Sequence, residues 1–363
     1  MRVPVSKQDI RRRRGVALVI VLLTLFTLGG MAAVFAYSMK VETRLAMNTS
    51  NAGELEWLGR SGVEYAKWIL MQQDRVGNER GFHALNQFWA GGPGPLESAD
   101  NPFEGLSLVD VPLGSGQISI EIRDTERLLN INREARNPLL MDLALARAGA
   151  DATDTAVITS ALADWIDRDD FAQAGNGAES EHYLSLDPPY RAKNGPIDDV
   201  RELLLVRGVS PSIFWGPDFR STEFGSGSDA RKPSRRDPRA SSAGLAEVFV
   251  ALSSGRVNIN TAPSAVLALL LGGDESLAEQ VIRIRAGQDG IDGTEDDQPA
   301  RSVGEIARLL GPAAAMGQDR FVTQSMTFEV RTTARLGPAK RRFSSLIRRV
   351  GARDFQVLLF RPE

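Results

Sequence analysis

A short basic segment followed by one long apolar run opens the sequence. Residues 16–37 contain no charged side chain, and a helix of this length spans about 33 Å at roughly 1.5 Å per residue. That span matches the hydrocarbon core of a bilayer, which is about 30 Å thick. Four consecutive arginines at 11–14 precede the run and predict a cytoplasmic N-terminus with the rest of the chain exported.

Three classes of N-terminal segment could have this pattern. A secretory signal peptide has a shorter apolar stretch of about 7–15 residues followed by a small-residue cleavage site, whereas Lys40, Glu42 and Arg44 follow the run here. A plain signal anchor fits the composition. A leader cut on the cytoplasmic side of the run would leave the helix in the product, and loss of residues 1–15 would change the net charge from -3 to -8.

The first helix is expected to continue beyond the membrane. Glu54, Arg60 and Lys67 lie on the charged side of this continuation. The other side carries apolar and small residues at helical spacing: Leu55, Leu58, Gly59, Gly62, Val63, Ala66, Ile69 and Leu70. The pattern predicts one long helix, half in the membrane and half packed on a globular domain. An ordinary membrane-proximal helix is the alternative.

Alternating or β-rich segments at both ends of the exported part predict a sheet. Residues 117–122 alternate with a period of two. Residues 326–334, 342–350 and 355–360 read as three further strands, separated by turn sequences at 337–338 and 351–354 that are typical of antiparallel pairs. The fold class is therefore α+β, with a long N-terminal helix on an antiparallel sheet and a large helical domain, residues 124–320, inserted into that sheet.

The inserted region shows five ordered matches that indicate a duplication. The first is the sequence at 129–132, which recurs at 257–260. Leucines follow the last Asn of each copy after seven and eleven residues, and a second helix and an acidic loop come next. The copies, 129–208 and 257–311, end with a Val-x-Glu motif and a glycine eight residues after the valine: Val200 to Gly208 and Val303 to Gly311.

Turn-rich and polar stretches set the remaining boundaries. Residues 91–102 are a linker, and residues 216–244, rich in Ser, Gly, Arg and Asp, are predicted to be a flexible insertion. The division assigns 1–15 to a leader, 16–37 to a transmembrane helix, 38–123 to the helix continuation with the first part of the sheet domain, 124–320 to the inserted domain and 321–363 to the C-terminal strands.

Composition removes several classes of chemistry. The chain has no cysteine and only two histidines, so thiol catalysis and cysteine metal centres are excluded and a multi-histidine centre has few donors. The sequence contains neither a Gly-x-Ser-x-Gly elbow nor a His-Glu-x-x-His motif. His182 beside Glu181 could form a hydrolase dyad, but a structural or surface histidine is favoured. Enzyme activity is not expected.

Two acidic loops are the candidate cation sites. Carboxylates gathered without basic partners repel one another, so a hard cation that takes six to eight oxygens would neutralise them. Neither loop has the twelve-residue EF-hand spacing, and solvated acidic loops are the alternative. The candidate ligands are Asp167, Asp169, Asp170, Glu179 and Glu181 in the first loop and Asp289, Asp292, Thr294, Asp296 and Asp297 in the second.

Motifs in the leader and the inserted domain carry a family resemblance. The sequence at 14–20 resembles a prepilin cleavage signature, with the cut expected between Gly15 and Val16. Four segments of the inserted domain resemble general secretion pathway protein K, the K-type minor pseudopilin of type II secretion. They are Asp-Trp-Ile-Asp at 164–167, Tyr-Leu-Ser-Leu-Asp-Pro-Pro-Tyr at 183–190, residues 200–208, and Asn-Ile-Asn-Thr-Ala-Pro at 258–263. The resemblance extends from the leader to about residue 311 and more loosely to the end, and residues 216–244 depart from it.

This resemblance implies a function and a set of partners. It implies a pseudopilin that caps the tip of a periplasmic fibre, initiates its assembly and aids export of folded proteins. Partners would be I- and J-type minor pseudopilins, the prepilin peptidase and the inner membrane, with N-terminal methylation and bound calcium. Most pilins carry glutamate at mature position five, where this chain has Ile20. K-type subunits lack that glutamate as well.

The alternative is a membrane-anchored DNA receptor. Residues 257–263 also resemble helix-hairpin-helix modules, which hold a phosphate with backbone N–H groups at a Gly-x-Gly turn. The turns at 148–151 and 271–275 lack that form and carry acids, and the acidic pI of about 5.7 argues against a nucleic-acid surface. No nucleic-acid partner is expected.

Overall fold

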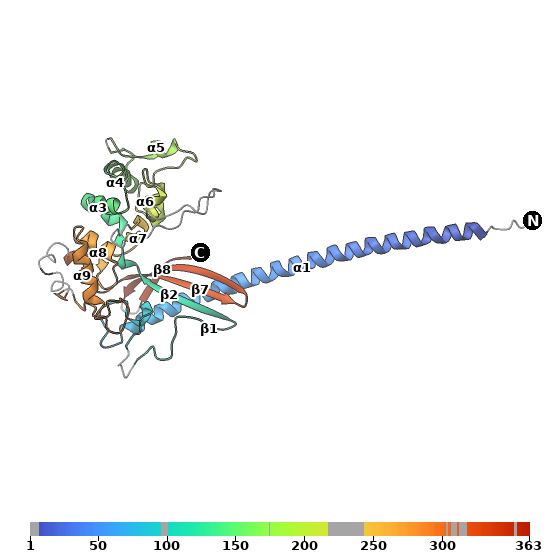
Figure 1. The fold of residues 1–363 in the computed structure, drawn as a ribbon, viewed down its shortest axis with the longest axis horizontal. Helices are drawn as coiled ribbons and strands as arrows, with labels where there is room; N and C mark the ends of the chain where they lie inside the picture. Colours follow the sequence, from blue (N-terminus) through green and yellow to red (C-terminus); the bar gives the residue numbers. More distant parts are fainter. Residues whose placement is uncertain are drawn as a thin grey trace, which may run out of the picture.

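The computed structural model describes residues 7–95, 101–173, 175–216, 243–302, 304–305, 311, 318–351 and 354–363. The first residues of the predicted leader, almost all of the predicted insertion at 216–244, and most of the motif from Val303 to Gly311 lie outside these ranges. Figure 1 shows a globular body with one long helix extending from it toward the N-terminus.

That helix, α1 (Lys7–Gln73), contains both predicted halves in one element. Its segment Val16–Gln73 is long and apolar enough to cross a membrane, and its most apolar window has a mean hydropathy of 2.5 with no buried residue. Farther along, every apolar member of the predicted face is buried, from Leu55 to Leu70. The apolar stripe is thus covered by protein only where the helix reaches the globular body.

The sheet has five antiparallel strands in the order β1-β2-β7-β8-β9. Their bounds are β1 Val111–Leu113, β2 Gly116–Asp124, β7 Thr327–Leu336, β8 Ala339–Gly351 and β9 Asp354–Pro362. The predicted strands at 117–122, 326–334, 342–350 and 355–360 are therefore confirmed within a few residues. Inward-facing Ile118, Ile120, Phe328, Val330 and Phe343 form one core with the buried face of α1.

A helix-rich region separates β2 from β7, as predicted. Its helices are α2 Ile131–Glu134, α3 Pro138–Arg147, α4 Ala152–Ile166, α5 Ser180–Leu184, α6 Pro211–Trp215, α7 Leu245–Val248, α8 Ser264–Leu270 and α9 Glu275–Arg285. The region also contains short 3-10 turns at Thr125–Arg127, Val200–Leu205 and Gln318–Arg320, and a further one at Phe88–Ala90 precedes β1. The region has its own apolar core, which includes Met141, Trp165 and Phe214.

Four two-residue strands join the inserted region to itself and to the sheet domain. They form two parallel pairs: β3 (Leu129–Asn130) with β4 (Phe249–Val250), and β5 (Val257–Asn258) with β6 (Phe321–Val322). In the second pair, β6 is followed along the chain by β7, so this pairing positions the end of the insertion beside the sheet.

Asn132 and Asn260 make the same contacts at matching places in the two predicted repeats. The Asn132 side chain donates to Ile197 O at 2.9 Å and accepts from Ile197 N at 2.7 Å. Asn260 makes the same pair with Ala300, at 2.9 Å and 2.8 Å. Ile197 and Ala300 each precede the closing Val-x-Glu motif by three residues. In each predicted repeat an asparagine thus fixes the chain just before that motif.

Candidate cation site on the inserted domain

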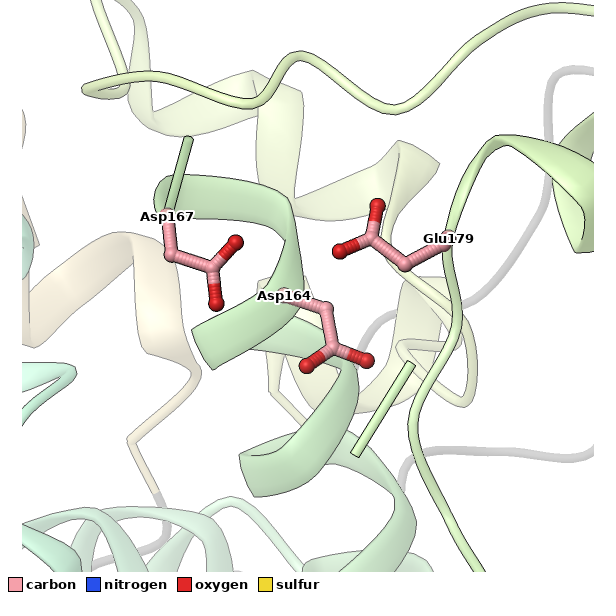
Figure 2. A group of neighbouring side chains, drawn as sticks. All are labelled: Asp164, Asp167 and Glu179. Atoms are coloured by element: carbon pink, nitrogen blue, oxygen red, sulfur yellow. The ribbon is translucent and has the colours of Figure 1, made fainter. Parts of the chain in front are cut away.

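Three carboxylates meet where α4 ends and α5 begins. Asp164 lies in the last turn of α4, Asp167 directly follows that helix, and Glu179 directly precedes α5. One oxygen from each residue lies within 4.8 Å of the others, and Figure 2 shows the three side chains converging from the two segments. Asp164 and Glu179 are buried, and Asp167 is half-buried.

Local sequence explains why these two segments come together. Asp151 caps the start of α4 by accepting from Thr153 N and Asp154 N, each at 2.8 Å. At the other end of α4, buried Trp165 meets the ring of Tyr183 edge-on at 5.2 Å. Because Tyr183 belongs to α5, this aromatic contact holds the Glu179 side of the loop against the end of α4.

Asp164 is fixed by backbone donors from the loop it faces. It accepts from Ala178 N at 2.8 Å and from Gln173 N at 3.2 Å. A β-carbon on Gly177 would lie 2.7 Å from Gln173 O and would also meet Asp164 Oδ2. Only glycine therefore lets the loop close so tightly around this carboxylate.

Glu179 has no such donors. Only 4% of the residue is exposed, yet both of its carboxylate oxygens are buried without a hydrogen-bond partner among the described residues, as is Asp167 Oδ1. A buried carboxylate without a partner is costly, because desolvation is not offset by any favourable contact. The geometry therefore leaves three oxygens free to bind a positive ion.

Electrostatics in the cluster agree with this geometry. Burial, followed by the negative charges of Asp164 and Asp167, raises the pKa of Glu179 to about 7. Burial and the charge of Asp169 raise the pKa of Asp167. By contrast, hydrogen bonds from Ser180 lower the pKa of Asp170. In this cluster a proton on Glu179 or a bound cation relieves the repulsion.

The predicted ligands of the first loop separate into two groups. Asp167 and Glu179 belong to the cluster, whereas the exposed Glu181 does not. Asp169 and Asp170 accept from Phe171 N and Ser180 N at 3.1 Å and 3.3 Å and add negative charge near Glu179. The sequence prediction missed Asp164, although its spacing of three from Asp167 could have indicated a shared helix side.

The second predicted loop is already satisfied internally. Asp292 forms two hydrogen bonds with Arg285, at 2.8 Å and 2.6 Å. Asp296 accepts from Gln288 N at 2.5 Å and from Asp289 N at 3.0 Å. The other predicted ligands also bond locally: Asp297 accepts from Gly293 N, Thr294 donates to Asp296, and Asp289 accepts from Ile291 N.

Oxygen ligands in the first cluster fit a hard cation such as calcium. Calcium takes six to eight oxygens, often from carboxylates and backbone carbonyls. The free oxygens of Glu179 and Asp167 could bind it, with Asp164 held in place beside them. Calcium at either loop stays a prediction, and the geometry favours the first loop.

Helix starts that could hold a phosphate are occupied by the chain's own acids. Asp151 caps α4, and Asp274 caps α9 by accepting from Leu277 N at 2.9 Å. These carboxylates use N–H groups that a helix-hairpin-helix module would offer to DNA, and their charge repels a phosphate. The DNA-receptor alternative is therefore not favoured.

Gly15, Val16 and Ile20, the positions of the predicted cleavage signature, lie within α1. Gly15 and Val16 are consecutive helical residues, and Val16 and Ile20 are 59% and 56% exposed. The exposed side chains of Val16 and Ile20 are free to contact lipid or another helix. Cleavage between Gly15 and Val16 stays a prediction.

Comparison with known proteins agrees with the motifs and the fold. Residues 127–215 match the family model described as "Type II secretion system (T2SS), protein K", and this range contains Asp164, Asp167 and Glu179. Over these residues the chain is similar to type II secretion system protein K. The resemblance stated from the sequence motifs is thus confirmed.

Relatives extend the match beyond that range. Protein K of Aeromonas hydrophila is 23% identical over 97% of both chains, and that of Klebsiella pneumoniae is 28% identical over 56% of this chain. The chain spans 60% of the length of the Klebsiella pneumoniae and Pectobacterium carotovorum relatives. A chain of the GspK-GspI-GspJ complex from enterotoxigenic Escherichia coli has the same fold, with a TM-score of 0.62, 20% identity and coverage of 88% of this chain and 99% of that one.

Proposed function

We propose that this chain is a minor pseudopilin that caps the tip of a periplasmic type II secretion fibre, initiates its assembly and aids export of folded proteins. The observation that carries the proposal is the continuous helix α1, which is bare and apolar at one end and packed on an antiparallel sheet at the other. That design gives one element two tasks: anchoring in the inner membrane and packing against other subunits.

A terminal position is supported by the inserted region and by Ile20. The insertion adds a second apolar core to the sheet domain, and such bulk suits the end of a fibre better than its shaft. A glutamate at that depth of the membrane would cost about 2.5–3.5 kcal/mol unless paired. Because Ile20 is uncharged, this position needs no neighbouring subunit to pair with a glutamate. The equivalent contacts of Asn132 and Asn260 support an insertion that arose by duplication of a helix-hairpin-helix-like unit.

Processing by a prepilin peptidase tests the proposal most directly. The full-length chain is co-expressed with the peptidase, and the membrane-bound product is sequenced from its N-terminus. A new terminus at Val16 is expected, with methylation of its amine, and Gly15→Val should block the cut. An unprocessed N-terminus would instead favour a plain signal anchor.

Partners follow from the same proposal. The solved chain with the same fold was crystallised in a complex named GspK-GspI-GspJ. We therefore expect this chain to associate with I- and J-type minor pseudopilins, with its bulk on the periplasmic side. Calcium at the Asp164–Asp167–Glu179 cluster would stabilise the inserted domain rather than perform catalysis, because it would join the end of α4 to the start of α5.

A further inference from the structure

The chain crosses between the sheet domain and the inserted region twice, at residues 124–128 and 322–327. β2 ends at Asp124 and β7 begins at Thr327, and the Thr125 hydroxyl donates to Thr327 O at 3.0 Å. The two crossings therefore lie side by side. Together they are here called the junction, and they are the covalent connections between the two regions.

Asp124 is a buried carboxylate of the junction with four hydrogen-bond donors. Its Oδ2 accepts from Ser325 Oγ and Thr261 Oγ1, each at 2.6 Å, and from Asn258 at 3.1 Å. Its Oδ1 accepts from Glu126 N at 2.7 Å. Burial raises the pKa of Asp124, and these donors oppose the shift because they favour the charged form. Of the acids at the junction, Asp124 is thus the one equipped to hold a negative charge.

Glu126, two residues along the same crossing, has no comparable set of donors. The residue is fully buried. Its Oε1 accepts from Ser254 N at 3.3 Å, and its Oε2 is buried without a hydrogen-bond partner among the described residues. Ionisation of this carboxyl group is unfavourable, because little offsets its loss of contact with water. A proton on Glu126 is therefore favoured while the junction is closed.

Basic side chains around the junction do not neutralise Glu126. Among the described residues, no ion pair within 4.0 Å joins Glu126 to a cation. Burial lowers the pKa of the adjacent Arg127, and the charge of Asp124 opposes that shift. Arg133 donates to Gly255 O, in the loop that also contacts Glu126. Three further arginines form their ion pairs with other acids: Arg123, Arg285 and Arg349.

His83 is the other titratable group that faces the junction. It is fully buried, its Nδ1 accepts from Ser325 N at 2.8 Å, and its backbone N–H donates to Thr323 O at 2.8 Å. Burial, followed by the positive charge of Arg349, lowers the pKa of His83 from 6.5 to about 3. His83 is therefore neutral in the closed junction and supplies no positive charge to Glu126.

We propose that the junction is a pH-sensitive joint, in which loss of the Glu126 proton places a second negative charge beside Asp124 and loosens the attachment of the inserted region to the sheet domain. With the proton in place, Glu126 stays closed against the loop at 251–256. Without it, two buried carboxylates repel each other until water reaches them. This joint goes beyond the proposed function and does not depend on it.

The direction of the pH effect follows from the environment of Glu126. Burial, followed by the charge of Asp124, raises the pKa of Glu126 from 4.5 to about 7. In an open, hydrated junction the pKa returns toward 4.5, so the closed state binds more protons. Its stabilisation is fully present below pH 4.5 and is lost as the pH rises through 7. The lowered pKa of His83 acts in the opposite direction, because acid below pH 6.5 favours opening.

Hydrogen–deuterium exchange of the full chain in detergent tests the joint. Peptides covering 122–128, 251–258 and 322–328 report opening of the junction, and peptides from the centres of α4 and β8 provide an internal reference. Wild type and Glu126→Gln are compared at pH 6, 7 and 8, after correction for the intrinsic pH dependence of amide exchange. The ratio of wild-type to variant exchange at the junction should rise about tenfold from pH 6 to 8. His83 is present in both proteins, so its titration cancels in the ratio.

Glu121→Gln is the matched control. Glu121 is an exposed acid on β2, five residues before Glu126, and it pairs with Arg123 at 2.6 Å. This variant should follow wild type at every pH. Glu126→Met is a second neutral variant of similar side-chain length, and it should give the same ratio as Glu126→Gln. It keeps the test decisive if the glutamine variant does not fold.

Two results would overturn the joint. A ratio that stays constant from pH 6 to 8 in the neutral variants would show that Glu126 ionises in the closed junction as it does in water. An equal rise in the reference peptides of α4 and β8 would show that the whole chain opens rather than the junction. Processing at Gly15 is measured separately, so failure of the joint and failure of the proposed function are distinguishable.

Discussion

Gly62 of α1 and Thr332 of β7 are in such close contact that position 62 has no room for a side chain. A β-carbon there would lie 2.7 Å from Thr332 Oγ1 and closer still to its methyl group. A β-carbon on Gly59, one turn earlier, would likewise lie 2.5 Å from Cδ2 of Phe343. These two glycines let the helix axis approach the sheet and bury the apolar side chains around them.

Gly62→Ala is therefore expected to destabilise the sheet domain. Alanine is favoured over glycine within a helix by about 1 kcal/mol, but overpacking at a buried contact costs about 1–3 kcal/mol. Gly53→Ala is the control, since nothing lies within 4 Å of its β-carbon, and it should stabilise the helix. Thermal unfolding of the full chain in detergent would show opposite shifts; shifts of the same sign would contradict the close packing.

Asn258→Ala should weaken the junction between the inserted region and the sheet. The Asn258 amide donates to Asp124 Oδ2 at 3.1 Å and to Ser325 Oγ at 2.8 Å. Burial raises the pKa of Asp124, and the hydrogen bonds it accepts oppose that shift. Removing one donor from a buried acid costs about 2–3 kcal/mol, so the melting temperature should fall.

Asn130, at the matching position of the first predicted repeat, offers a comparison for this variant. Asn130 is only half-buried and donates to Ala251 O and Ser253 O at 3.4 Å and 3.3 Å, and it donates to no acid among the described residues. Asn130→Ala should therefore lower the free energy of unfolding by less than Asn258→Ala does. Equal losses would show that the acid at the junction is not the source of the effect.

Sequence periodicity predicted the elements whose burial repeats regularly. The α1 face follows from helical spacing, and the β7–β8 hairpin follows from two β-rich runs around Gly337. The strands β3 to β6 are too short for any period to show. Their two-residue pairings depend on how distant segments pack, which sequence spacing alone does not encode.

Only part of the candidate site was predictable from the sequence, because its geometry also depends on how distant segments pack. The sequence predicted an acidic loop around Asp167 and Glu179, but it could not show that Arg285 neutralises Asp292 while Glu179 is left without a donor. That distinction depends on the closure of each loop. Asp164 was missed because it precedes the loop and belongs to α4.

Calcium should raise the unfolding temperature of the chain through the Asp164–Asp167–Glu179 cluster. A ligand that binds only the folded state stabilises it by about 2.7 kcal/mol at a hundred times its Kd. Glu179→Gln should abolish the calcium-induced shift, because it removes the buried charge with the fewest other contacts. Glu181→Gln, two residues away and exposed, should retain the shift. A chelator titration compared across the three proteins provides the measurement, and an unchanged shift in Glu179→Gln would exclude this cluster.

Without calcium, the same glutamate should make stability fall as the pH rises. The pKa of Glu179 is raised from 4.5 to about 7 in the folded chain, so the folded state binds more protons than the unfolded state between these values. Its contribution to the free energy of unfolding is therefore fully present below pH 4.5 and is lost as the pH rises through 7. The pKa of Asp167 is also raised, so the informative quantity is the difference between wild type and Glu179→Gln.

The fall in wild-type stability with rising pH should become smaller when calcium is present. Calcium replaces the proton on Glu179, so the calcium-induced rise in melting temperature should be largest above pH 7 and small near pH 5. Glu179→Gln has no proton to lose at this position, and its stability in chelator should vary less between pH 5 and 8. Melting curves at several pH values, with calcium and with chelator, give both comparisons. Parallel curves for wild type and Glu179→Gln across this range would mean that Glu179 ionises normally, and the buried, unpartnered carboxylate could not then be the centre of a cation site.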